Sequence, residues 1–236
     1  MKKLLFLLFI LCFSSTYAAR PKHQYIKITT QKGECIIKLY NETPLHRDNF
    51  IKLTKQGFYN GTLFHRVIKA FMIQGGDPTS KNATPESSLG DGGDDMPRIP
   101  AEFRDSLFHK KGVLAAARDD NPEKESSSCQ FYIVQGKVFT DSMLNVVETK
   151  RLKFKIPEWQ REVYKTIGGT PHLDRNYTVY GEVVKGLEMV DAVAATETGK
   201  ADRPKEDVKM MVTVLKKRAA RKLEKELAKK ARLSLR

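Results

Sequence analysis

Several features of common functional sites are scarce or absent in this sequence. Its 236 residues hold three cysteines and five histidines, and none of these follows the spacing of a zinc site. The longest apolar run, at positions 4–13, is well short of the roughly 20 residues that span a bilayer. No Gly-x-Ser-x-Gly elbow is present. Zinc proteins, membrane-spanning helices and hydrolases of the nucleophile-elbow type are therefore poor interpretations of the chain.

The first eighteen residues have the order of a secretory signal peptide. Lys2 and Lys3 precede the apolar run, and Ser14 and Ser15 follow it. Thr16-Tyr17-Ala18 then matches the small-residue pattern of a cleavage site. We expect a signal peptide at 1–18 and an exported mature chain. A periplasm is the favoured location, with secretion or a eukaryotic secretory pathway as alternatives. In the last case the sequons could carry glycans; they begin at Asn41, Asn60, Asn82 and Asn176.

Positive charge gathers at the other end of the chain. Residues 216–236 hold ten Lys or Arg and two Glu, a net charge of +8 out of +14 for the whole sequence. Ala219, Leu223, Leu227 and Ala231 recur at helical spacing there. We expect a basic C-terminal helix that contacts an anionic membrane or polysaccharide surface, the alternative being a solvated basic helix. Nucleic acid is not an expected partner, because export would remove the protein from it.

The central part of the chain has a β pattern. Residues 25–29 and 35–39 predict a hairpin, and Thr43-Pro44 predicts the start of a helix ending near Gly57. Further short strands are expected at 63–68, 71–74, 112–116, 131–135, 178–184 and 209–215. A long loop at 77–100 and a helical insertion at 138–169 interrupt them. Many short strands and few helices favour an antiparallel barrel or sandwich. Cys35 and Cys129 lie in this part, and the sequence leaves their pairing open.

The most informative segment, residues 64–77, reads FHRVIKAFMIQGGD. In a strand, Met72 and Gln74 lie on the same face. A guanidinium and an amide beside Phe and Met would form an apolar pocket with a few fixed donors, as small-ligand sites do. A barrel strand whose polar side chains face water fits the same pattern, so periodicity alone leaves both open. A hydrolase built from the serines at 126–128 with His65 and Asp77 is a much weaker alternative.

This segment resembles the signature of the cyclophilin family of peptidyl-prolyl cis–trans isomerases. Three more blocks in the family's order support the resemblance: KGVLAAA at 111–117, CQFYI at 129–133 and YTVYGEV at 177–183. The resemblance, especially to bacterial exported members, implies a mainly β fold: a closed eight-stranded antiparallel barrel capped by two helices. It would span 19–215, between the signal peptide and the basic extension at 216–236.

The resemblance also implies an activity and a site. Isomerisation of Xaa-Pro bonds in exported proteins would assist their folding, and it needs no metal or cofactor. The residues implied as catalytic are Arg66, Phe71 and Gln74. Those implied as binding the proline-containing polypeptide are Met72, Ala117, Arg118, Gln130, Tyr132, His172, Leu173 and Tyr177. The alternative is a cyclophilin-like module that grips proline segments as a binding or chaperone protein without catalysis.

Four of these positions depart from the common family pattern. Arg118 stands where many relatives have Asn, Tyr132 where Phe is common, His172 where eukaryotic members often have Trp, and Tyr177 where many have His. The charges of Arg118 and the neighbouring Asp119 are expected to alter preference around the proline, and Tyr132 adds a hydroxyl at the pocket. The absence of Trp at His172 is expected to weaken cyclosporin binding while leaving catalysis possible.

Overall fold

The fold is that of a computed structural model in which residues 22–234 are described, so the predicted signal peptide lies outside the described residues. The first described strands, β1 (Gln24–Thr30) and β2 (Gly33–Leu39), form the predicted hairpin with Ile26 opposite Ile37. Gly33 closes the turn with φ of +124°, which a residue with a side chain rarely adopts.

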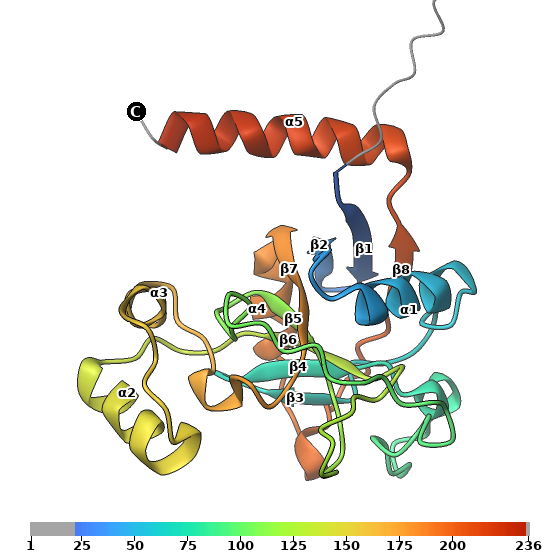
Figure 1. Cartoon of the computed structure of the whole chain (residues 1–236). Coiled ribbons are helices and arrows are strands. Elements are labelled where there is room, and N and C mark those ends of the chain that lie inside the picture. Colours follow the sequence, from blue (N-terminus) through green and yellow to red (C-terminus); the bar gives the residue numbers. More distant parts are fainter. Residues whose placement is uncertain (1–21, 235–236) are drawn as a thin grey trace, which may run out of the picture.

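Eight strands form a single antiparallel sheet (Figure 1). The other six are β3 (Arg66–Ile68), β4 (Met72–Gly75), β5 (Val113–Ala116), β6 (Phe131–Val134), β7 (Val179–Lys185) and β8 (Met211–Val214). Their order is β3-β4-β6-β5-β7-β2-β1-β8. Every predicted strand is thus found within a few residues of its expected place.

The predicted closure of the barrel is not confirmed. The two end strands, β3 and β8, do not pair with each other, so the sheet is curled but open between them. A single bridge, Leu63 with Lys209, joins the segments that precede these strands, where the Phe64 N–H also donates to the Val208 carbonyl at 2.9 Å. The two ends of the sheet are therefore joined by a few backbone hydrogen bonds rather than by a continuous ladder of strand pairs.

Two helices cover the concave core of the sheet, as predicted. Helix α1 (Pro44–Lys55) contributes Phe50 and Leu53 to the core, and α4 (Leu187–Ala194) contributes Val190 and Val193. Strand side chains alternate, because successive residues point to opposite faces. On β6, Phe131 and Ile133 enter this core while Tyr132 and Val134 join a second apolar cluster on the outer face.

The start of α1 differs chemically from the prediction. Thr43 occupies the cap position, but its side chain makes no capping hydrogen bond. Instead the buried Glu102 carboxylate accepts the backbone N–H groups of Leu45 and His46, at 3.2 and 3.0 Å. A carboxylate from a distant loop thus takes over the role of the local cap, where it also meets the positive end of the helix dipole.

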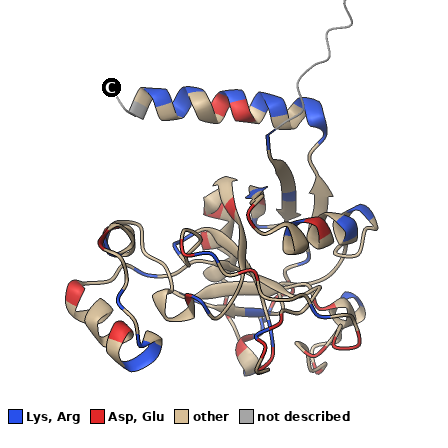
Figure 2. Cartoon of the chain, in the orientation of Figure 1, with Lys and Arg blue, Asp and Glu red and all other residues tan. Residues whose placement is uncertain are grey.

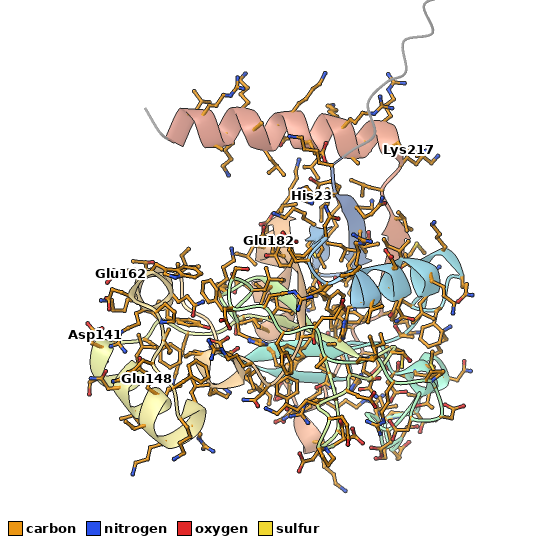
Figure 3. The ribbon with its side chains drawn as sticks, viewed as in Figure 1. His23, Asp141, Glu148, Glu162, Glu182 and Lys217 are labelled. Carbon is orange, nitrogen blue, oxygen red and sulfur yellow. The ribbon has the colours of Figure 1, made fainter. Side chains whose placement is uncertain are left out.

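The predicted insertion is helical and packs beside the sheet. It consists of α2 (Asp141–Val147), a π-helical turn η2 (Glu148–Leu152) and α3 (Glu158–Thr166). Arg161 of α3 lies between Glu148 and Asp141, with N···O distances of 2.6 and 2.8 Å. Figure 3 labels both acids and Glu162, which pairs with Lys165 at 2.6 Å. Ion pairs therefore join the two helices around a small apolar cluster of their own.

The basic extension forms α5 (Lys217–Ser234), a long helix lying over the β1 end of the sheet (Figure 1). Ala220 and Leu223 are buried against Tyr25, whereas Ala219 of the predicted stripe is exposed. Glu224 accepts the backbone N–H of His23 at 3.2 Å. The apolar stripe thus serves to dock the helix. Within residues 22–234, no helix has both the length and the apolar character needed to cross a membrane.

The two cysteines in the described part of the chain are buried and unpaired. Burial raises the pKa of Cys35 to about 12 and that of Cys129 to about 11. Both are therefore neutral thiols at physiological pH, and they act as small apolar groups in the core.

Candidate active site

Three predicted site residues form a row across neighbouring strands. Arg66 on β3 pairs with Gln74 on β4, and Gln74 pairs with Tyr132 on β6. Residues paired across antiparallel strands place their side chains on the same face. This face is the outer one, so the row lies in a cleft of about 720 Å³ outside the main core.

An apolar slot adjoins the row. Met72 and Tyr132 are buried in the outer cluster, and Phe71 and Leu173 pack against it while remaining partly exposed. All four line the cleft. Leu173 comes from a 3-10 turn, η3 (Pro171–Leu173), which immediately follows the insertion. The four residues that the resemblance implied as one slot thus lie together in the structure.

Arg66 is held loosely at the edge of this slot. Its side chain is 44% exposed, and its Nε lies 3.4 Å from a carboxylate oxygen of Asp202, which is itself 46% exposed. Half-exposed ion pairs of this length contribute little to stability. The remaining guanidinium donors can therefore reorient toward a bound group, and they stay charged at any physiological pH.

Gln74 and Gln130 connect the row to the long loop. The Gln74 amide donates to Gln130 Oε1 at 3.1 Å, and Gln130 Nε2 donates to the carbonyls of Gly90 and Gly92 at 2.6 and 3.0 Å. Gln130 is 5% exposed and does not line the cleft itself. It therefore positions Gln74 and the loop, rather than facing the cleft as predicted.

The buried Asp77 carboxylate holds the same loop in place through hydrogen bonds. It accepts the backbone N–H groups of Thr79 and Gly90 at 2.7 and 2.6 Å. Burial opposes its ionisation, but these bonds and that from the Thr79 hydroxyl lower the pKa of Asp77. At Gly92 a Cβ would lie 1.9 Å from the Asp77 carboxylate, so only glycine fits. The loop is thus a structured wall of the cleft.

The hydroxyl of Tyr132 begins a buried chain of hydrogen bonds. It lies 2.9 Å from His109 Nε2, and His109 Nδ1 lies 2.9 Å from Asp174, which accepts the Tyr164 hydroxyl at 2.7 Å. Tyr164 belongs to α3, so this chain links the insertion to the floor of the cleft. Burial raises the pKa of both tyrosines well above the ordinary value, so both remain donors. With Asp174 accepting from Nδ1, His109 Nε2 is the acceptor for Tyr132.

Arg118 and Tyr177 form the opposite wall. The Arg118 guanidinium lies 4.9 Å from the Tyr177 ring centre, and its Nε donates to the Asn176 carbonyl at 2.9 Å. Ala117 also lines the cleft, but its N–H donates to the Gln130 carbonyl and its own carbonyl accepts from Ser127. The backbone N–H of Ala117 is therefore not free to hold a peptide, contrary to expectation.

His172 lies outside the cleft. It stacks on the far side of Phe71, with ring centres 5.5 Å apart, and lines a neighbouring cavity. Phe71 stands between the His172 ring and the cleft, so the predicted contact is not formed.

Two parts of the cleft wall were missed by sequence reasoning. One is the segment 85–91 of the long loop, and the other is the turn η4 (Lys200–Asp202) with Arg203. Arg203 joins them by donating to the carbonyls of Thr84 and Ser87 at 2.7 and 3.2 Å. Loop length was a signal for the first segment. Nothing in the pattern near residue 200 marked the second, since it is close to the cleft only in three dimensions.

The hydrolase alternative finds no support. Ser126 does lie 3.0 Å from His46 Nε2, and His46 Nδ1 lies 2.7 Å from Glu102. However, Ser126 is 1% exposed, and the adjoining cavity of about 10 Å³ has no room for a substrate. His65 lines the cleft without contacting this serine. The Ser-His-Glu group is therefore structural.

Comparison with known proteins gives an independent view of the chain. The family model "Cyclophilin type peptidyl-prolyl cis-trans isomerase/CLD" matches residues 25–214. A Staphylococcus saprophyticus protein named as a peptidyl-prolyl cis–trans isomerase is 36% identical over 180 residues, which cover 76% of this chain and 85% of that one. A Streptococcus pyogenes protein named as a bifunctional phosphatase and peptidyl-prolyl cis–trans isomerase is 36% identical over 186 residues. This match covers 78% of the present chain but only 37% of that relative.

A solved structure shows a similar fold. It is a cyclophilin type peptidyl-prolyl cis–trans isomerase of Cryptosporidium parvum, crystallised in the presence of the dipeptide Ala-Pro. The TM-score is 0.59 at 21% sequence identity, and the match covers 82% of this chain and 99% of that one.

Proposed function

Because the chain belongs to the cyclophilin family of peptidyl-prolyl cis–trans isomerases, we propose that its cleft catalyses rotation about Xaa-Pro bonds with Arg66 as the central catalytic residue. One observation carries the assignment. A half-exposed guanidinium with a single weak partner stands at the edge of an apolar slot and in register with Gln74. The staphylococcal relative's name and the Ala-Pro dipeptide in the Cryptosporidium crystal support the same substrate class.

The chemistry requires stabilisation of a twisted amide. Rotation about a peptide bond faces a barrier of about 18–20 kcal/mol, because conjugation gives the C–N bond partial double-bond character. At the twisted transition state the prolyl nitrogen regains a lone pair. Arg66 can donate to that nitrogen or to the adjacent carbonyl, and its donors accelerate rotation only if they bind the twisted amide better than the planar one.

The remaining residues would hold the substrate. Phe71, Met72, Tyr132 and Leu173 would enclose the proline ring, and Gln74 would donate to the peptide backbone. Gln130 would act through Gln74, and Arg118 with Tyr177 would form the wall beside the flanking residue. This arrangement needs no covalent intermediate.

A direct test is the cis–trans exchange rate of an Xaa-Pro peptide, measured by NMR in the presence of the chain from residue 19. The proposal predicts exchange far above the uncatalysed rate at substoichiometric protein. Peptide binding without faster exchange would instead identify a non-catalytic proline-binding module, the second function that this cleft could serve.

We also propose that the protein acts on exported polypeptides and assists their folding. The support is the signal-like order of residues 1–18, ahead of an isomerase domain at 19–215 that includes the insertion at 138–169. A periplasmic location is proposed first. Mass spectrometry of the protein from a fractionated native host should find Ala19 at the N-terminus, in the exported fraction. A cytoplasmic chain that keeps Met1 would contradict this.

For the extension at 216–236 we propose contact with an anionic surface. Ala220 and Leu223 of α5 are buried against Tyr25, and the apolar stripe is narrow, so charge rather than insertion would supply the contact. Figure 2 shows basic residues along the rest of the helix. Sedimentation with anionic and neutral liposomes, and with an acidic polysaccharide, should show salt-sensitive binding to anionic surfaces only. Replacement of Lys229, Lys230 and Arg232 by Gln should abolish it, and unchanged binding would refute the idea.

A further inference from the structure

A second cavity lies directly behind the cleft, between the sheet and the insertion. Its volume is about 630 Å³, and it shares Phe71, Leu173, Tyr177 and Arg118 with the cleft. Phe71 is the partition, since one side lines the cleft and His172 stacks on it from the other. We call this space the insertion cavity. The two cavities are therefore neighbours that share part of their walls, and residues flanking a proline bound in the cleft would lie close to the insertion cavity.

The insertion cavity has one sign of charge. Four cations line it, namely Arg118, Lys137, Lys150 and Arg151, and no Asp or Glu does. Lys150 and Arg151 belong to η2, at the end of α2, where Figure 2 shows a basic stretch. This segment is held in place by the buried Glu148, so the two cations are presented by a fixed turn rather than a loose loop.

Three of the four cavity cations have no acidic partner within the described part of the chain, and the fourth, Arg118, lies 3.8 Å from a carboxylate oxygen of the exposed Asp120. Arg161, Lys155 and Lys165 of the insertion each form at least one ion pair. Among residues 22–234, no ion pair is formed by Lys137, Lys150 or Arg151. The acidic residues of the insertion thus pair with cations within the insertion, and none of them lines the cavity.

The electrostatic consequence is visible at His172. Burial lowers the pKa of this histidine, the charges of His109, Arg151 and Lys137 lower it further, and Asp174 acts in the opposite direction. The cavity wall also contains apolar side chains, Val146 and Val147, and the buried Thr170 hydroxyl has no hydrogen-bond partner within the described residues. A positive space with apolar walls suits an acidic side chain carried on a polypeptide.

We propose that the insertion cavity is a second peptide subsite, which binds a Glu or Asp side chain flanking the proline held in the cleft. The inference rests on the proposed function of the cleft and adds a substrate class to it: proline segments with a nearby acidic residue. The insertion would then act as a specificity element. Attraction between partly exposed charges is modest and is screened by salt, so the preference should be clearest at low ionic strength.

The experiment uses pairs of proline peptides that differ only by Glu or Gln, with the substitution placed at each of three positions on either side of the proline. Both kcat/KM and Kd are measured at about 20 mM and 500 mM salt. At one or two positions we expect the Glu peptide to exceed its Gln partner about fivefold at low salt and to lose this advantage at high salt.

Variants locate the effect. Lys150→Gln with Arg151→Gln should bring the Glu-to-Gln ratio close to one. A control pair with the same change of charge, Lys32→Gln with Lys209→Gln, lies away from both cavities and should keep the ratio. Ratios near one at every position in the unmodified protein, or a ratio that survives the η2 variant, would overturn the subsite.

The readouts also separate this proposal from the proposed function. If no peptide is isomerised, the catalytic assignment fails, while the Kd ratios still decide whether the subsite exists. If all peptides are isomerised and bound alike, catalysis stands and the subsite is refuted.

Discussion

The hydrogen-bond chain from the insertion to the cleft makes a quantitative prediction about coupling. Tyr164→Phe removes one donor from Asp174, whose side chain is 6% exposed, and Tyr132→Phe removes the donor to His109 Nε2. Neither change creates a large cavity. Each effect should therefore report the hydrogen bond rather than packing.

The magnitudes follow from the charge of each acceptor. The bond from Tyr164 ends on a buried carboxylate, so its loss should cost about 2 kcal/mol of unfolding free energy, against roughly 1 kcal/mol for the bond between Tyr132 and the His109 ring. For a domain of this size, 2 kcal/mol lowers Tm by roughly 4–8 °C. Because Asp174 holds His109 and His109 holds Tyr132, the two losses should not add. We expect a coupling energy of at least ~0.5 kcal/mol.

Urea denaturation of the four proteins of this double-mutant cycle measures the coupling. Tyr40→Phe serves as a control, since Tyr40 is buried in the same outer cluster but lies outside the chain. It should be additive with Tyr164→Phe. Additivity of Tyr132→Phe and Tyr164→Phe within about 0.3 kcal/mol would refute the reasoning, because the insertion would then be mechanically separate from the cleft.

Three further predictions concern buried charge. Arg161→Leu removes an ion-pair partner from the buried Glu148, so urea denaturation should show an unfolding free energy about 3 kcal/mol lower. The control Arg232→Leu changes an exposed residue and should cost under ~0.5 kcal/mol. Burial lowers the pKa of His65 to about 4, so this histidine contributes stability that is lost as pH falls from about 6.5 to 4. His65→Phe should remove that share of the loss and leave the share of His46 and His172, whose pKa burial also lowers; identical pH profiles would contradict it. Burial opposes ionisation of Glu182, but its two lysine partners lower its pKa to about 2. The stability difference between wild type and Glu182→Gln should be constant above pH 5 and vanish as pH falls from about 4.3 to 2; a difference that persists at pH 2 would exclude this pairing.

Much of the fold could be predicted, because local patterns carried it. The hairpin, α1 and each later strand have apolar residues at the period of their element. The cap of α1 could not be predicted, since Glu102 arrives from 57 residues away. Closure of the barrel was expected from resemblance alone. Pairing between two end strands depends on how the whole sheet curls, which no local pattern encodes.

The site divides in the same way. The resemblance implied Arg66, Gln74 and Tyr132 as site residues, and strand register in the structure places the three in one row. His172 was misplaced because the sequence does not show that Phe71 stands between it and the cleft. The roles of Gln130 and of the turn at 200–203 depend on contacts between loops far apart in the chain, and only the three-dimensional structure reveals them.

The central claim is that Arg66 accelerates rotation without being needed for binding. The most direct measurement compares wild type and Arg66→Ala on one Xaa-Pro peptide, with exchange rate and Kd taken from the same NMR titration, and with circular dichroism to verify folding. We predict at least a tenfold fall in the catalysed rate, about 1.4 kcal/mol, with Kd changed less than threefold. An unchanged rate in the folded variant, or a loss explained entirely by weaker binding, would contradict the assignment.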